Sequence, residues 1–134
     1  LTGYIYILLK NIVFFGVSDD EKNYFQLAAK ITTIITERMN VPCSQTDIEG
    51  VRRIGKKGDK PRPVIVTLLT VGKKVEILIN KKTLQNTSYY IKEDFPPKVL
   101  AQRKMLQTQL KKLKEEGKEA FIKYDKIVIN NIIS

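Results

Sequence analysis

A short basic loop between two β-prone segments constrains the fold of this chain more than any other stretch. Residues 64–69 (VIVTLL) are apolar and rich in β-branched side chains, which favour a strand. Residues 47–55, before the loop, also favour a strand. Between them, residues 56–63 contain glycines and prolines that end regular structure and favour a turn. The sequence therefore predicts two strands joined by a loop, around which the rest of the chain must build a core.

Positive charge gathers in this loop and at the strand end before it. A single carboxylate, Asp59, accompanies six cations there. The whole chain carries 24 Lys and Arg against 14 Asp and Glu, a net charge of +10. A field of this sign attracts polyanions, so nucleic acid is the first partner to consider and an anionic membrane the second. The alternative is an ordinary solvated hairpin tip. The candidate phosphate-binding residues are Arg52, Arg53, Lys56, Lys57, Lys60 and Arg62.

The residue inventory argues against catalysis. The chain has no histidine and one cysteine, Cys43, which excludes Ser-His-Asp and Cys-His triads, histidine-containing zinc sites and an internal disulfide. The sequence contains no nucleophile-base pair, metal-ligand cluster or phosphate-binding glycine motif. We therefore expect a non-enzymatic protein with no catalytic residue, no metal and no cofactor. Cys43 is expected to be a half-buried apolar residue in a reducing compartment.

The segments before the loop predict a strand and a long helix. Residues 11–17 alternate bulky side chains around a glycine, which favours a strand. Ser18 and Glu21 have the spacing of a capping box, so a helix is expected over residues 19–40. Its predicted apolar face consists of Phe25, Ala28, Ile31, Thr32, Ile34, Ile35 and Met39.

The segments after the loop complete the first domain. A second helix is expected to begin at Gly72, followed by a strand over residues 88–92. The apolar face of that helix is predicted to contain Val75, Leu78 and Ile79. The predicted order is βαββαβ, so we expect an α+β chain whose residues 11–93 have the ferredoxin-like split βαβ arrangement.

Sheets of this type commonly bind RNA on their open face, through aromatic residues of the two central strands. Phe14 and Phe15 are adjacent in the first strand, so they must point to opposite faces. Residues 64–69 contain no aromatic residue. We therefore do not expect the standard two-base stacking surface.

The remaining residues, 94–134, predict a small C-terminal domain. A helix is expected over residues 98–116, and residues 121–130 are expected to form a hairpin with its turn at Asp125 and Lys126. Arg103 falls inside the apolar stripe of the helix, where a cation must face a cleft, pair with an acid or extend its head to solvent. The apolar stripe contains Val99, Leu106, Leu110 and Leu113, and another face carries Lys104, Lys111, Lys114 and Lys118.

The first ten residues are apolar but too short to cross a bilayer, which needs about 20 residues. They also lack the charged start and cleavage site of a signal peptide. We expect residues 1–10 to be the end of a preceding region. The lysine-rich helix has few large apolar residues opposite its lysines and the chain has no tryptophan, so membrane binding is not expected.

Six short motifs, taken in order, resemble the first-open-reading-frame protein of LINE-type non-LTR retrotransposons. The similarity covers residues 11–130, which correspond to a non-standard RNA recognition domain and a C-terminal domain. Each motif is weak alone, and their common order makes the resemblance specific. The motifs are residues 11–17 (NIVFFGV), 52–56 (RRIGK), 60–66 (KPRPVIV), 91–96 (IKEDFP), 103–104 (RK) and 122–128 (IKYDKIV).

The resemblance implies a protein that coats single-stranded RNA of its own element and acts as a nucleic-acid chaperone. Single-stranded DNA is a second candidate partner. Members of the family form trimers through an amino-terminal coiled coil, which would lie in a region not included in this chain. The implied location is a cytoplasmic ribonucleoprotein, with the nucleus as a second site. The implied RNA contacts are Arg52, Arg53, Arg103, Lys104 and Tyr124, and the lysine face adds Lys111.

Two other interpretations remain open. A host RNA-binding protein derived from such an element would have the same sequence features. Alternatively, the split βαβ fold can serve as a protein-interaction module, which would expose an apolar helix or sheet patch instead of a basic surface. For the nucleic-acid interpretation, we predict a cleft between the recognition domain and the C-terminal helix and hairpin.

Overall fold

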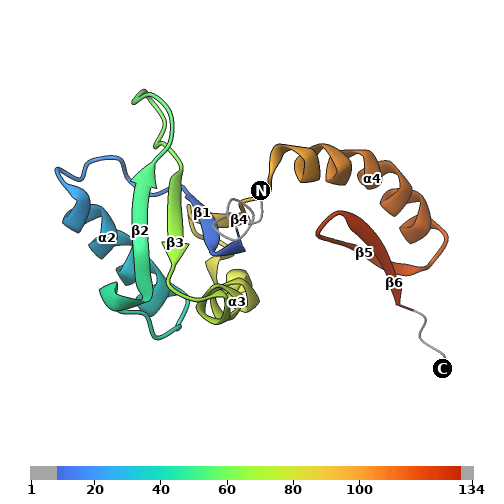
Figure 1. Cartoon of the computed structure of the whole chain (residues 1–134), viewed down its shortest axis with the longest axis horizontal. Coiled ribbons are helices and arrows are strands. Elements are labelled where there is room, and N and C mark those ends of the chain that lie inside the picture. Colours follow the sequence, from blue (N-terminus) through green and yellow to red (C-terminus); the bar gives the residue numbers. More distant parts are fainter. Residues whose placement is uncertain (1–8, 131–134) are drawn as a thin grey trace. The chain divides into compact units, whose positions relative to one another are not determined.

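The chain forms two compact units, Leu1–Asp94 and Phe95–Ser134, and the computed structural model describes residues 9–130 of it (Figure 1). Residues 1–8, which make up most of the expected N-terminal segment, lie outside the described residues. Both units contain helix and strand, so the predicted α+β class is confirmed.

An antiparallel sheet is the framework of the first unit. Its described strands lie in the order β2-β3-β1-β4, and their bounds differ by a few residues from those predicted. The strands are β1 (Asn11–Phe15), β2 (Ile48–Arg53), β3 (Val64–Leu68) and β4 (Tyr90–Glu93). The helical segments are α2 (Tyr24–Thr33), a π-helical turn (Ile34–Arg38), α3 (Val71–Ile79) and two 3-10 turns (Gln45–Asp47 and Lys81–Leu84).

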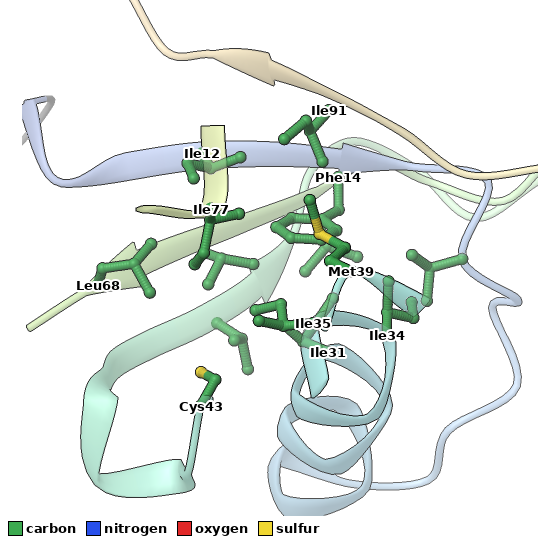
Figure 2. Packing of buried hydrophobic residues seen from close by; sticks show 14 of the residues in the cluster. Ile12, Phe14, Ile31, Ile34, Ile35, Met39, Cys43, Leu68, Ile77 and Ile91 are labelled. Atoms are coloured by element: carbon green, nitrogen blue, oxygen red, sulfur yellow. The ribbon is translucent and has the colours of Figure 1, made fainter. Parts of the chain in front are cut away.

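Both helices pack on one face of this sheet. Phe14 of β1, Ile31 of α2 and Ile77 of α3 are fully buried in a single cluster (Figure 2). Side chains alternate along a strand, so the neighbouring residue Phe15 points to the opposite, open face. Cys43 belongs to the same cluster and is more deeply buried than predicted, and this burial raises the pKa of its thiol.

The start of α2 differs from the prediction. The helix begins at Tyr24, and the side chain of Asn23 caps it by accepting a hydrogen bond from the Gln26 amide. The expected capping box of Ser18 and Glu21 is wrong because the Glu21 carboxylate binds Arg53 of β2 instead. Leu27 joins the core, whereas Phe25 is exposed.

The core-facing residues of α3 also differ from the prediction. Ile77 is buried, Leu78 is half-buried, and Val75 and Ile79 are exposed. Lys74 lies on the buried side, where its ammonium is 3.3 Å from a carboxylate oxygen of Glu93. A lysine on the covered face is rare in proteins, so the apolar pattern alone favoured the wrong face.

The second unit consists of one helix and one hairpin. The helix α4 (Pro97–Glu115) is followed by β5 (Glu119–Lys123) and β6 (Lys126–Asn130). The predicted apolar stripe is confirmed, since Val99 and Leu110 are buried and Leu106 and Leu113 are half-buried. The hairpin turn is Tyr124–Asp125, one residue earlier than expected. Over residues 9–130, no helix has both the length and the apolar character needed to span a membrane.

Candidate functional site

The basic loop projects beyond the ends of β2 and β3 (Figure 1). At its base, the Ile54 amide donates a hydrogen bond to the Pro63 carbonyl oxygen at 2.9 Å, which continues the ladder between the strands. Gly55 has a φ of +87°, a conformation that residues with a side chain rarely adopt. The loop is therefore a projecting hairpin connection whose base is fixed by the sheet.

The side chain of Arg53 is buried within the first unit, with only 5% of it exposed. Its guanidinium donates to both carboxylate oxygens of Glu21, with Nε 2.9 Å from Oε2 and Nη2 2.7 Å from Oε1. Nη1 also donates to the carbonyl oxygens of Val17 and Arg62, at 2.9 and 2.7 Å. These contacts use the donors of the guanidinium to join the end of β2 to the segment that precedes α2.

Arg62 forms a second ion pair at the other side of the loop. Its Nε and Nη2 atoms donate to the two carboxylate oxygens of Asp19, at 2.8 and 3.1 Å. Bidentate geometry of this kind is among the stronger arrangements for an arginine and a carboxylate. Arg53 and Arg62 were both predicted to bind phosphate, and the structure places both in ion pairs that anchor the loop.

The two carboxylates of this network are strongly acidic. Hydrogen bonds from Arg53 lower the pKa of Glu21 from 4.5 to about 2, although burial acts in the opposite direction. The hydrogen bonds from Arg62 hold the pKa of Asp19 far below its usual value of 3.8. Both groups are therefore ionised at neutral pH, and the arginines that face them are neutralised locally.

The other loop cations face solvent. Arg52, Lys56, Lys57 and Lys60 are all exposed, and within the described part of the chain none of them has an ion-pair partner. The loop contains one carboxylate, that of Asp59. The structure thus separates the predicted cations into two ion-paired arginines and four solvent-facing residues.

Arg52 belongs to a row of residues that crosses the open face of the sheet. The strand registers place Arg52 opposite Ile65, Ile65 opposite Val13, and Val13 opposite Lys92. Directly paired residues lie on the same face of a sheet. The open face therefore has an apolar centre, in which Val13 and Ile65 are each 9% exposed, with one cation on each side.

An aromatic pair lies beside this row. The rings of Phe15 and Tyr90 stack with centroids 4.5 Å apart and planes 4° from parallel. The Lys92 ammonium lies 5.7 Å from the Phe15 centroid and 6.0 Å from the Tyr90 centroid. Sequence reasoning missed Tyr90 because it considered aromatic residues of the central strands only. The predicted strand over residues 88–92 contains two adjacent tyrosines, Tyr89 and Tyr90. One of two neighbouring strand residues must face outward, so this pair was the signal that the sequence offered.

The second unit brings together Arg103 and Tyr124, two of the residues predicted to contact RNA. Arg103 Nη1 donates to the Tyr124 carbonyl oxygen at 2.7 Å, and the guanidinium carbon lies 4.3 Å from the ring centroid of Phe95. The Phe95 and Tyr124 rings meet edge to face, with centroids 6.0 Å apart. Arg103 is thus stabilised by a carbonyl oxygen and an aromatic ring, whereas a cleft, an acid or solvent had been expected around its head group.

The predicted lysines of α4 are solvent-facing. Lys104 and Lys111 are both exposed, as the lysine face of the helix requires. Lys111 and Lys114 line a surface depression of about 610 Å³ together with Leu110. Among the described residues, no group of three or more histidine, cysteine, aspartate or glutamate side chains is placed to hold a metal ion.

No protein-family model matches the chain, and no curated protein matches it. The resemblance to the LINE-type proteins therefore stays a prediction based on the six motifs.

Proposed function

We propose that this protein binds single-stranded nucleic acid, mainly RNA, with little sequence specificity and without catalysing a reaction. The first unit would be a ferredoxin-like, non-standard RNA recognition domain. The strand order β2-β3-β1-β4 and the chain order β-α-β-β-α-β support that assignment. The C-terminal helix and hairpin would add further contacts to the nucleic acid.

The observation that carries this proposal is the separation of the loop cations. Arg53 and Arg62 pair with Glu21 and Asp19, so the exposed loop cations have only the carboxylate of Asp59 beside them in the loop. Arg52, Lys56, Lys57 and Lys60 are consequently available to phosphate groups. A hairpin tip that merely improved solubility would carry both signs of charge interspersed.

The open face of the sheet supports the same proposal through its aromatic surface. Beside Lys92 it offers the aromatic surface of the Phe15–Tyr90 pair, which suits unpaired bases because every base has an apolar ring face. Phosphate contacts position a strand without reading its sequence. Cations around a stacking surface therefore favour a binder of single strands with weak sequence preference.

The resemblance to LINE-type proteins supports a more specific form of this proposal. The protein would coat the RNA of a retroelement as a ribonucleoprotein and act as a nucleic-acid chaperone. We assign this particle to the cytoplasm, with the nucleus as a second location, and the resemblance implies that the family forms trimers. A strand-annealing assay tests the chaperone activity, and an unchanged annealing rate would contradict it.

A salt titration tests the binding itself. Affinity for a single-stranded RNA of about 20 nucleotides should fall steeply between about 50 and 200 mM salt, because released counterions drive phosphate binding. Replacing Lys56 and Lys57 by alanine should lower the slope of log affinity against log salt by about 0.7 for each lost phosphate contact. The matched control replaces Lys22 and Arg38, two exposed cations elsewhere on the unit, and should leave the slope unchanged.

Two results would overturn the proposal. One is an affinity that hardly changes over this range of salt. The other is an equal loss of affinity in the loop variant and in the control, which carry the same net charge. Titrations with double-stranded RNA and with single-stranded DNA, under the same conditions, define the preferred class of nucleic acid.

A protein-interaction module is the second candidate function, and the outer side of α3 favours it. Three apolar residues recur there every four positions and are exposed: Val71 (42% exposed), Val75 (46%) and Ile79 (73%). An apolar stripe on a helix is a common docking surface for another protein. Sedimentation over a range of concentrations, with Val75→Lys as the variant, tests association through this stripe. A monomer that behaves identically in both forms would exclude self-association there.

A further inference from the structure

The geometry of the β4 edge points to a subsite for one unpaired nucleobase, and we propose that the base stacks on the outer face of the Tyr90 ring. The proposal rests on the single-strand binding function proposed above. It adds a defined position, with its own stacking surface and its own phosphate contacts.

The Tyr90 ring has one covered face and one open face. Phe15 covers the first face, in a stack with a centroid separation of 4.5 Å. Even so, 51% of Tyr90 is exposed. In the described sheet, β4 is an edge strand, so no further strand lies beside Tyr90 on the outer side. A base placed there would extend the Phe15–Tyr90 stack by one ring.

The stack is held in place before any ligand arrives. Phe15 and Tyr90 are direct partners across the β1–β4 ladder, so the backbone fixes the separation of their rings. A tyrosine has few rotatable bonds, and the stacked neighbour restricts them further. Because these side chains are already ordered, binding of a base costs little conformational entropy of the protein.

A cavity of about 420 Å³ adjoins Tyr90 and supplies polar groups. Its lining includes Lys81 and Lys82, whose ammonium groups suit phosphate, and Gln85 and Asn86, whose side-chain amides can donate to and accept from a base edge. The volume falls in the range of ordinary small-ligand pockets. Aromatic surface, amides and cations together form the chemistry that recognises a nucleotide.

Lys92 adds a cation on the open face itself. Its ammonium is within about 6 Å of both ring centroids and its side chain is exposed. The phosphates on either side of a base stacked on Tyr90 would thus meet Lys92 toward the sheet and Lys81 or Lys82 toward the cavity. A strand following this path would continue across the row that ends at Arg52.

Substitution of Tyr90 tests the stacking surface. Tyr90→Ala should weaken the binding of single-stranded RNA roughly 5- to 150-fold, which is the range for removing one base-aromatic stack. Tyr90→Phe should retain the affinity, because stacking needs the ring and not the hydroxyl. Tyr24→Ala is the matched control, since Tyr24 is a similarly exposed tyrosine that meets Phe25 edge to face elsewhere on the unit, and it should change nothing.

A strand of the same length with abasic sugars separates stacking from phosphate binding. The wild-type protein should bind the abasic strand more weakly, and Tyr90→Ala should cause no further loss with it. Equal losses with both strands would overturn the stacking proposal, and so would an unchanged affinity of Tyr90→Ala for normal RNA. Failure of the wild-type protein to bind either strand would instead refute the proposed function. If Tyr90→Ala lowers the melting temperature, Tyr90→Leu keeps an apolar side chain without a π-face and should show the same loss of RNA affinity.

Discussion

Arg53 forms a bidentate ion pair with Glu21, in which Nε and Nη2 lie 2.9 and 2.7 Å from the two carboxylate oxygens. The pair joins the last residue of β2 to the segment that precedes α2, and both side chains are almost completely buried. It fixes the base of the basic loop against the helical layer. The neighbouring residue Arg52 points to the open face and keeps its charge exposed.

We expect Arg53→Ala to lower mainly the stability of the protein and Arg52→Ala to lower mainly its affinity for RNA. Removing Arg53 leaves the buried Glu21 carboxylate with Lys30 as its remaining ion-pair partner among the described residues, so the free energy of unfolding should fall by about 3 kcal/mol. Removing Arg52 should change it by less than about 0.5 kcal/mol, because the residue is exposed, and should weaken RNA binding. Urea denaturation and RNA titration of both variants check this, and equal destabilisation by the two would contradict it.

The acidic carboxylates predict how stability depends on pH. The pKa of Glu21 falls from 4.5 to about 2 on folding, so its contribution is complete above pH 4.5 and is lost as the pH falls toward 2. A shift of this size corresponds to about 3 kcal/mol. We expect the urea midpoint to be constant from pH 7 to about pH 5 and then to decline.

The matched variants for this pH profile are Glu21→Gln and Glu37→Gln. Glu21→Gln should be less stable at pH 7 and should decline less between pH 4.5 and 2. Glu37 is exposed, so its replacement should leave the profile unchanged. A Glu21→Gln profile that runs parallel to the wild-type profile would show that the ion pair does not stabilise the fold.

The strands and the loop could be predicted from the sequence because their signals are local. β-branched runs and the glycines and prolines between them depend on a few neighbouring residues. The start of α2 could not be predicted in this way. Whether Glu21 caps the helix or binds Arg53 depends on a residue that lies 32 positions later in the chain. The apolar pattern of α3 likewise did not reveal its buried side, because Lys74 lies on that side with its ammonium beside Glu93, which is 19 positions later in the chain.

The orientation of the candidate site residues also depends on contacts between residues that are distant in the sequence. Strand alternation requires Arg52 and Arg53 to point in opposite directions, but the sequence does not say which one faces outward. The register with β3 decides it, because Arg53 pairs with the buried Val64 and Arg52 pairs with Ile65 on the other face. Tyr90 was similarly assigned to the open face only by its pairing with Phe15.

Gly16→Ala should be more destabilising than Gly117→Ala. Both glycines have a positive φ, +82° and +80°, which costs an alanine about 1–2 kcal/mol. At Gly16 a Cβ atom would also lie 2.0 Å from the Ser88 carbonyl oxygen, whereas nothing lies within 4 Å at Gly117. Relieving that overlap should add about 1–3 kcal/mol.

Amide hydrogen exchange measures the local stability of both glycine variants. Gly16 lies in the first unit and Gly117 in the second, so each variant is compared with the wild-type protein within its own unit. Since Gly16 follows β1 and Ser88 precedes β4, the exchange rates should rise in the β1–β4 ladder that carries Phe15 and Tyr90. Equal changes in the two variants would mean that the close approach at Gly16 is relieved without cost.

Arg103→Lys should loosen the second unit although it keeps the charge. The guanidinium lies 4.3 Å from the Phe95 ring centroid and donates to the Tyr124 carbonyl oxygen, and Tyr124 has a left-handed backbone with a φ of +55°. Primed two-residue hairpin turns need a positive φ at this position, and a tyrosine adopts it only at a cost. A lysine lacks the planar group that makes both contacts, so we expect a loss of roughly 1–2 kcal/mol and faster amide exchange in β5 and β6. Lys104→Ala, at the next and exposed position, should leave exchange unchanged. If Arg103 acted on RNA alone, Arg103→Lys would lower RNA affinity and leave the hairpin amides as protected as in the wild-type protein.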